Sequence, residues 1–224
     1  MVTMERIVLT VVVCLLAFGN AAICMGQTDD ELKKFEAAAL FSSITKPEFS
    51  STETDAGVGA RFTFNLNKSI ALEAEGIIFP HRCFGCKPEN RGRLSEFFAG
   101  IKAGKRFEHF GVFAKARPGL ANFSRGENIP LIISNGVGQF PFVDFEQHNK
   151  TNFAADLGAV VEFYPTKRVF VRFDAGDTMI RYTNRLNTFL TFDAISNIVT
   201  PIVIRLPTET VHNFQFTSSV GFRF

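Results

Sequence analysis

The chain contains no tryptophan and two tyrosines among 224 residues, yet it has 27 phenylalanines. Phenylalanine has no hydrogen-bonding group, so this bias favours surfaces that face something apolar, either a core or lipid. An excess of one charge is also missing, because 24 basic residues oppose 22 acidic ones and leave a net charge of +2. So small a net charge gives no reason to expect nucleic acid as a partner.

A hydrophobic run long enough to cross a membrane as a helix is absent as well. The apolar run 7–18 has twelve residues, whereas a membrane-spanning helix needs about 20. It follows Arg6 and precedes small residues such as Gly19, which is the layout of a secretory signal peptide. We therefore predict a signal peptide over residues 1–26 and one mature domain over residues 27–224.

After this segment, apolar and polar residues alternate with a period of two, which is typical of strands with two different faces. In 56–66, for example, Val58, Phe62 and Phe64 lie on one face, and Arg61 and Thr63 lie on the other. Segments of about this length recur as far as the C-terminus, separated by turn residues. The eight predicted strands are 35–44, 56–66, 69–79, 93–107, 111–122, 151–164, 169–182 and 211–224.

The connections between these strands alternate in length. The first, third, fifth and seventh are long, and the second, fourth and sixth are tight. In an up-and-down barrel this places all tight turns on the periplasmic side and all long loops outside. The pattern predicts an all-β fold, an eight-stranded antiparallel up-and-down transmembrane β-barrel, located in the cell outer membrane.

The polar faces of the predicted strands carry nearly balanced charge. An eight-stranded barrel is only wide enough inside for side chains, and buried charges must be paired. Glycines on the same faces would make room for long side chains. A soluble lipocalin-like barrel, with the charges in water, is the alternative. The predicted lumen ion network comprises Arg61, Glu73, Glu75, Glu96, Lys102, Arg106, Lys115, Arg117, Asp156, Glu162, Arg172, Asp174 and Arg223.

The segments 60–67, 72–76 and 111–119, together with the closing strand 214–224, resemble the small OmpA-like outer-membrane barrel domains of Gram-negative cells. The resemblance covers about residues 35–224. It implies that Phe216, Phe222 and Phe224 form the closing-strand signal read by the barrel assembly machinery. The chain departs from the family in lacking Trp and Tyr girdles, so Phe would have to occupy both membrane interfaces.

Other chemistry-bearing residues give weaker patterns. Cys83 and Cys86, beside His81, supply too few ligands for zinc, so we predict a loop disulfide in an oxidising compartment. His148 and His212 could approach acidic side chains, such as Asp144 or Asp177, near the outer rim. Nothing in the sequence unites these residues into a catalytic set, so we predict no catalytic residue, no cofactor and no metal.

The sequence therefore predicts a non-enzymatic outer-membrane barrel with a structural or surface-interaction role and a polar lumen plugged by side chains. Its expected partners are outer-membrane lipid, the barrel assembly machinery and an extracellular ligand bound through the long loops. The alternatives are a small porin-like channel, an outer-membrane enzyme (a protease or a lipid A modifying enzyme) and a soluble lipocalin-like binder. The apolar segments 129–133, 140–143, 189–192 and 201–204 are expected to extend the strands as hairpins or to fold over the barrel mouth.

Overall fold

The structure is a computed structural model that describes residues 33–47, 52–80, 93–133, 142–183, 186–193 and 198–224. The predicted signal peptide and the pair Cys83 and Cys86 lie outside these residues. No helix within the described ranges is long and apolar enough to cross a membrane. The strands are β1 (Phe35–Pro47), β2 (Thr52–Asn65), β3 (Ile70–Pro80), β4 (Arg93–Arg106), β5 (Phe110–Ile133), β6 (Phe142–Phe163), β7 (Val169–Tyr182), β8 (Leu186–Asp193), β9 (Ile198–Arg205) and β10 (Glu209–Arg223).

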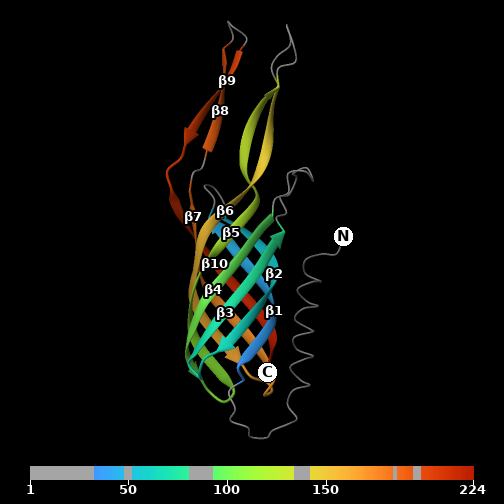
Figure 1. Cartoon of the computed structure of the whole chain (residues 1–224), viewed down its shortest axis with the longest axis vertical. Helices are drawn as coiled ribbons and strands as arrows, with labels where there is room; N and C mark the ends of the chain where they lie inside the picture. Colours follow the sequence, from blue (N-terminus) through green and yellow to red (C-terminus); the bar gives the residue numbers. More distant parts are fainter. Residues whose placement is uncertain (1–32, 48–51, 81–92, 134–141, 184–185, 194–197) are drawn as a thin grey trace, which may run out of the picture.

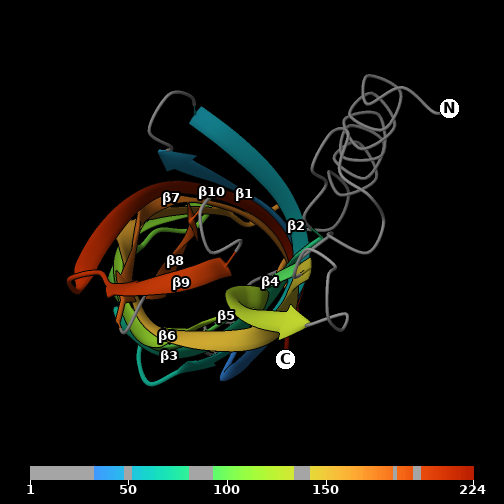
Figure 2. The same ribbon diagram turned by 90° about the horizontal axis from the view of Figure 1, so that it is seen from above.

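Eight of these strands close into one antiparallel barrel, in the order β1-β10-β7-β6-β5-β4-β3-β2. Each barrel strand pairs with the barrel strands that precede and follow it along the chain, and β10 returns to pair with β1. Figure 2 looks down the axis of the closed ring. The predicted eight-stranded antiparallel up-and-down barrel is thus confirmed.

The strand register fixes the tilt of the barrel wall. Paired residues followed once around the ring from Phe35 lead back to Thr45, ten positions further along β1, so the shear number is 10. With eight strands, usual strand spacing and usual rise per residue, this shear tilts the strands by roughly 40°. The path passes through Phe64, Leu72, Ile101, Ala116, Leu157, Asp177 and Phe214.

Alternate residues of each barrel strand face opposite sides of the wall. The outward residues are apolar and exposed: the exposed fractions are 60% for Val58, 59% for Phe214 and 62% for Phe222. Inward residues are buried even when they are charged, as Lys102 and Arg172 are, both at 0%. An apolar outer wall with a polar interior inverts the arrangement of a soluble barrel and suits a wall surrounded by lipid.

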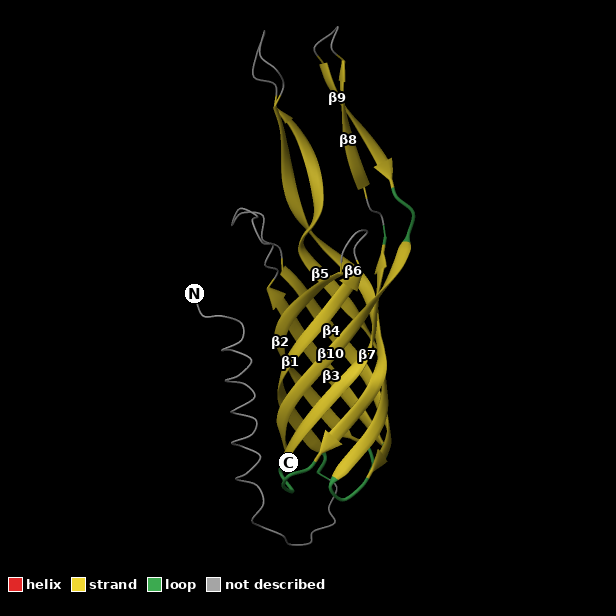
Figure 3. Cartoon of the chain, turned by 180° about the vertical axis from the view of Figure 1, so that it is seen from behind, coloured by secondary structure: helices red, strands yellow, loops and turns green. Residues whose placement is uncertain are grey.

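The tight turns gather at one end of the barrel, which we call the turn end (Figure 3). The Asn67 side-chain oxygen accepts hydrogen bonds from the backbone N–H groups of Ser69 and Ile70, both at 2.8 Å, and so closes the β2–β3 turn. The Thr166 hydroxyl accepts one from Val169 N–H at 2.9 Å in the β6–β7 turn. These side-chain contacts replace ladder bonds where the chain reverses.

At the opposite end, which we call the hairpin end, the structure replaces two predicted loops with paired strands, and of the two alternatives for the apolar segments it shows hairpins. The fifth connection, predicted as a loop over 123–150, is mostly an extension of β5 and β6, which remain paired as far as Ile133 and Phe142. The seventh connection, predicted as a loop over 183–210, contains the separate hairpin β8–β9. Both hairpins rise beyond the barrel (Figure 1). Runs of consecutive apolar residues, such as 129–133 and 201–204, interrupt the alternation on which the strand prediction relied.

The closing strand meets the first strand along a seam of ten paired positions, from Glu36–Arg223 to Thr45–Phe214. Backbone hydrogen bonds run from Phe35 N–H to the Phe224 carbonyl at 3.0 Å and from Phe224 N–H to the Phe35 carbonyl at 2.8 Å. The rings of Phe35 and Phe224 stack with centroids 6.0 Å apart. The seam removes the last sheet edge, as a strand structure in lipid requires.

The outward face of β4 offers a matched test of the lipid-facing wall. Ala99 lies halfway along that face, and Ala103 lies near the turn end. We expect Ala99→Arg to lower the free energy of unfolding in lipid by about 2–4 kcal/mol and Ala103→Arg by about 0–1 kcal/mol, because the cost of a lipid-facing charge falls toward the interface. Equal costs for the two variants in chemical unfolding would contradict the orientation of the wall.

Candidate functional site in the barrel interior

The centre of the interior is occupied by Arg117, which projects from β5. Its guanidinium donates to both carboxylate oxygens of Glu75, at 2.9 and 3.0 Å, and its Nε donates to Asp156 at 2.8 Å. Opposite it, a Cβ atom on Gly100 would lie 3.0 Å from the Arg117 Cγ and nearer still to the backbone. Glycine at position 100 therefore leaves the space that the arginine side chain fills.

A second buried arginine, Arg172, ties together opposite sides of the barrel. From β7, its two terminal guanidinium nitrogens donate to the two carboxylate oxygens of Glu73 on β3. The hydrogen bond from Nη2 to Oε2 is 3.0 Å long. Its Nε also donates to Asp174 at 2.8 Å. Strands β7 and β3 are four positions apart around the ring, so this contact spans the lumen.

Arg61 on β2 extends the same layer of charge. It pairs with Glu75 on the neighbouring strand and with Asp174 on β7, and its Nη1 donates to the Ser219 hydroxyl at 3.2 Å. The side chains of Arg61, Glu75 and Asp174 are each at most 1% exposed. Each guanidinium in this layer thus meets carboxylates from more than one strand, which offsets the cost of burying it.

Two lysines complete the layer. Lys102 pairs with Glu162 and lies 3.5 Å from a Glu73 oxygen, and its Nζ is 4.6 Å from the centroid of the Phe113 ring. Lys115 Nζ lies 2.9 Å from Asp156. Charge pairing and a cation–π contact together replace the water that an exposed ammonium group would bind.

A polar cluster closes the interior toward the turn end. Glu36 accepts hydrogen bonds from Asn65 at 2.8 Å and from Arg106 at 3.1 Å. Tyr164 accepts from Arg106 Nε at 3.0 Å and donates to Glu162 at 2.8 Å. Burial raises the pKa of the Tyr164 hydroxyl, and the Glu162 carboxylate adds to the effect. The hydroxyl therefore stays protonated and acts as a donor.

The structure brings most of the predicted lumen residues into contact. Glu96 lies nearer the hairpin end and accepts a hydrogen bond from Gln215 at 3.3 Å. Arg223 lies at the turn end, with its guanidinium carbon 4.2 Å from the centroid of the Tyr164 ring. The residues that form ion pairs with one another are Arg61, Glu73, Glu75, Lys102, Arg106, Lys115, Arg117, Asp156, Glu162, Arg172 and Asp174.

Sequence reasoning missed Glu36, which is 1% exposed and pairs with Arg106 and Lys102. It adds a seventh acid to the six predicted ones, against seven predicted bases, and Asp55 adds an eighth buried acid on β2. A period-two reading of 35–44 could have found Glu36, because it alternates with Phe35 and Ala37 and shares its face with Ser42.

The interior also contains an apolar cluster that the prediction did not include. It occupies the half of the barrel toward the hairpin end and shares the inward face with the charges. Its sequence signal is the loss of alternation at 77–79 and 97–98, where both faces are apolar. The apolar cluster comprises Leu40, Ile44, Ile77, Phe79, Leu94, Phe98, Ala121, Ala154 and Ile180.

The predicted closing-strand residues Phe216, Phe222 and Phe224 all project outward and are 42%, 62% and 61% exposed. The ring of Phe216 stacks on Phe173 of β7 with centroids 6.3 Å apart. The three rings therefore belong to the outer wall and take no part in the interior network.

One histidine meets an acidic partner on the outer wall. His212 Nδ1 lies 2.6 Å from Asp177 Oδ2, and the two side chains are 66% and 42% exposed. His148 is also exposed. The His212–Asp177 pair lies on the outward faces of β10 and β7.

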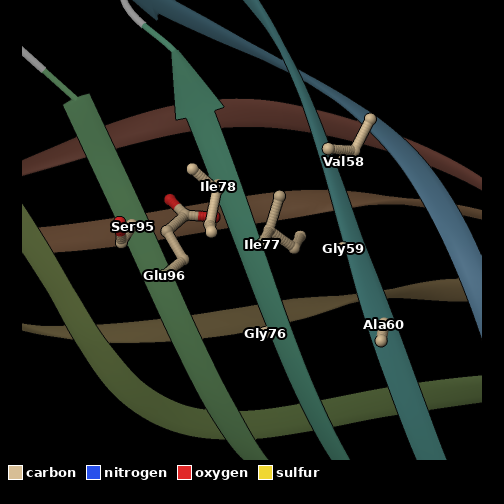
Figure 4. Close-up of a pocket in the computed structure, with 8 residues that line it drawn as sticks. All are labelled: Val58, Gly59, Ala60, Gly76, Ile77, Ile78, Ser95 and Glu96. Atoms are coloured by element: carbon tan, nitrogen blue, oxygen red, sulfur yellow. The ribbon is translucent and has the colours of Figure 1, made fainter.

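A shallow depression crosses β2, β3 and β4 on the outer wall. It has a volume of about 540 Å³, and its lining includes outward-facing Gly76 (Figure 4). A Cβ atom on Gly76 would meet nothing closer than the Glu96 carbonyl at 4.0 Å. Outward Val58, Ala60 and Ile78 make the depression apolar.

Across the described residues, no group of three or more His, Cys, Asp or Glu side chains is placed to hold a metal ion.

Comparison with solved structures identifies the fold. Neisserial surface protein A (NspA) superposes with a TM-score of 0.51 at 11% identity, covering 85% of this chain and 97% of NspA. A second similar structure is Ail, the attachment invasion locus protein of Yersinia pestis, solved in complex with the heparin analogue sucrose octasulfate. It superposes with a TM-score of 0.50 at 9% identity, and the match covers 86% of this chain and 100% of Ail. No protein-family model and no curated protein matches the sequence. The chain has the fold of the small OmpA-like outer-membrane barrels, as its sequence predicts.

The contact between Arg172 and Glu73 provides a test of the interior network. We expect Arg172→Met to lower the free energy of unfolding by about 3–5 kcal/mol, because the buried Glu73 carboxylate loses its arginine partner. Combined with Glu73→Leu, the loss should fall short of the sum of the single losses by about 1–3 kcal/mol. Arg181→Met, at an exposed outward position on β7, is the control and should cost less than about 1 kcal/mol. Equal losses for Arg172→Met and the control would show that the pair is not buried as described.

Proposed function

We propose that this protein is a non-conducting outer-membrane barrel that holds two apolar β-hairpins outside the cell as a surface-interaction device, and that it has no enzymatic activity. The observation that carries the proposal is the contrast between a barrel filled by its own side chains and two long hairpins extending beyond it. Such a barrel serves as an anchor, and the part of the chain left for contact with other molecules is the hairpin end.

The interior supports a closed lumen in two ways. Ion pairs such as Arg172–Glu73 join strands on opposite sides of the ring, so their side chains cross the path an ion would take. The apolar cluster lies between this layer and the hairpin end, and an apolar constriction opposes the passage of water and ions. Both features argue against the small porin-like channel.

The hairpins support an interaction role. In β9, Ile202 and Ile204 are each 46% exposed. A two-stranded hairpin is at best marginally stable alone, and exposed apolar surface of this kind is typical of binding surfaces. Because β8 and β9 pair only with each other, the hairpin is free to add its apolar face to a protein partner.

The outer wall supports delivery to the outer membrane. The closing strand carries outward-facing Phe222, outward-facing Phe224 follows it, and the strand pairs with β1 along the seam. We propose that Phe216, Phe222 and Phe224 are read by the barrel assembly machinery before they enter lipid, and that outer-membrane lipid then surrounds the wall. The exposed His212–Asp177 pair is assigned no catalytic role.

Conductance in planar lipid bilayers tests the closed lumen. We expect the purified barrel to insert without steady openings, while a porin added to the same bilayer confirms that openings are detectable. Insertion is verified independently by protease protection of the barrel in vesicles. Steady openings on the nanosiemens scale would contradict the closed lumen.

The hairpin role is tested on whole cells that display the protein. We expect Ile202→Asn combined with Ile204→Asn to abolish the protein-dependent attachment of cells to an apolar surface, because it makes the exposed face of β9 polar. Thr191→Asn, an exposed polar position on β8, is the matched control and should leave attachment unchanged. Attachment that survives the double substitution at unchanged surface level would contradict the role of β8–β9.

A further inference from the structure

Exposed basic side chains collect at the turn end, directly beyond the apolar wall. In this part of the described chain, the exposed acidic side chain that accompanies them is Glu108 in the β4–β5 turn. The exposed basic side chains described here therefore outnumber the exposed acidic one, although the whole protein is nearly neutral. The basic collar comprises Lys34, Lys68, Lys105, Lys167 and Arg168.

One part of the basic collar faces the lipid side of the wall. Lys105 follows the outward residues Ile101 and Ala103 on β4, and its Nζ lies 5.3 Å from the centroid of the Phe107 ring. The Gly104 N–H donates to the Ser69 carbonyl at 2.8 Å, which holds the β2–β3 turn containing Lys68 against β4. Lys68 and Lys105 therefore belong to neighbouring segments at the turn end, and both side chains are exposed.

The other part is fixed by the seam. Arg223 donates from its backbone N–H to the Arg168 carbonyl at 2.7 Å and from its guanidinium to the Lys167 carbonyl at 3.4 Å. These bonds use the backbone of the β6–β7 turn and leave the Lys167 and Arg168 side chains exposed. Lys34 lies next to Phe35, which is bonded to Phe224 at the end of the same seam.

We propose that the basic collar binds the phosphate groups of anionic phospholipids in the membrane leaflet that surrounds the turn end. This rests on the proposed function, because it requires the wall to lie in the outer membrane. The apolar wall ends at Phe35, Phe107 and Phe110, so the next layer is the headgroup layer. Lysine stems lie along apolar surface while their ammonium groups reach phosphate, and Arg168 can bind a phosphate with two donors. The outward direction of Lys105 favours lipid over a soluble polymer, which would approach along the barrel axis.

The test measures phospholipid binding to the folded full barrel by native mass spectrometry, with phosphatidylglycerol and phosphatidylcholine as probes. We expect phosphatidylglycerol to bind more tightly, and more weakly as salt rises. Each lost charge should weaken phosphatidylglycerol binding about fivefold. Lys167→Gln combined with Arg168→Gln should therefore weaken it about 25-fold and leave phosphatidylcholine binding unchanged.

The control is Arg181→Gln combined with Arg205→Gln, which removes two exposed charges at the hairpin end and should leave the binding of both lipids unchanged. If the first double variant does not fold, Lys34→Gln combined with Lys105→Gln takes its place.

Equal binding of the two lipids by the wild-type barrel would overturn the basic collar as a phosphate site. So would an equal loss in the hairpin-end control, or stronger binding to isolated peptidoglycan than to phosphatidylglycerol. These results leave the closed lumen and the hairpin role intact, whereas steady ion conduction would overturn the proposed function and leave the lipid preference measurable.

Discussion

Charges enclosed by a narrow barrel have little water to solvate them, so each needs an opposite charge within reach. That requirement governs the rest of this molecule. Eight strands set the width, and a shear number of 10 sets which positions share a level. Arg172 reaches Glu73 across the ring because the register places them together. The interior can be highly charged and still closed, because its bases lie within ion-pair distance of its acids.

The same pairing gives the hairpins a rigid base. Arg61 on β2 contacts Asp174 on β7, and so links the two strands that flank the seam strands β1 and β10. On the hairpin side, the apolar cluster, which includes Phe79 and Phe98, fills the lumen. The strands that continue into the β5–β6 hairpin therefore leave a packed barrel.

The sequence predicted the barrel because alternation in each strand and the lengths of the connections are local properties that lipid and lumen impose directly. It placed Arg117 and Glu75 on the inward face for the same reason. It could not predict that Arg117 would bind Glu75 and Asp156 together, because that depends on register between strands. It left open whether the apolar segments within 186–205 form hairpins or fold over the barrel mouth, because that choice also depends on pairing between strands, and the structure shows the β8–β9 hairpin.

The fold and the proposed function both require the polar face of the strands to point into a closed barrel and the phenylalanine-rich face to meet lipid. Cell fractionation combined with gel migration before and after heating tests this arrangement most directly, because a folded outer-membrane barrel resists detergent until it is boiled. We expect the chain in the outer-membrane fraction. We also expect its unheated form to migrate faster than its heated form. A chain in the soluble periplasmic fraction, with identical migration before and after heating, would contradict this arrangement.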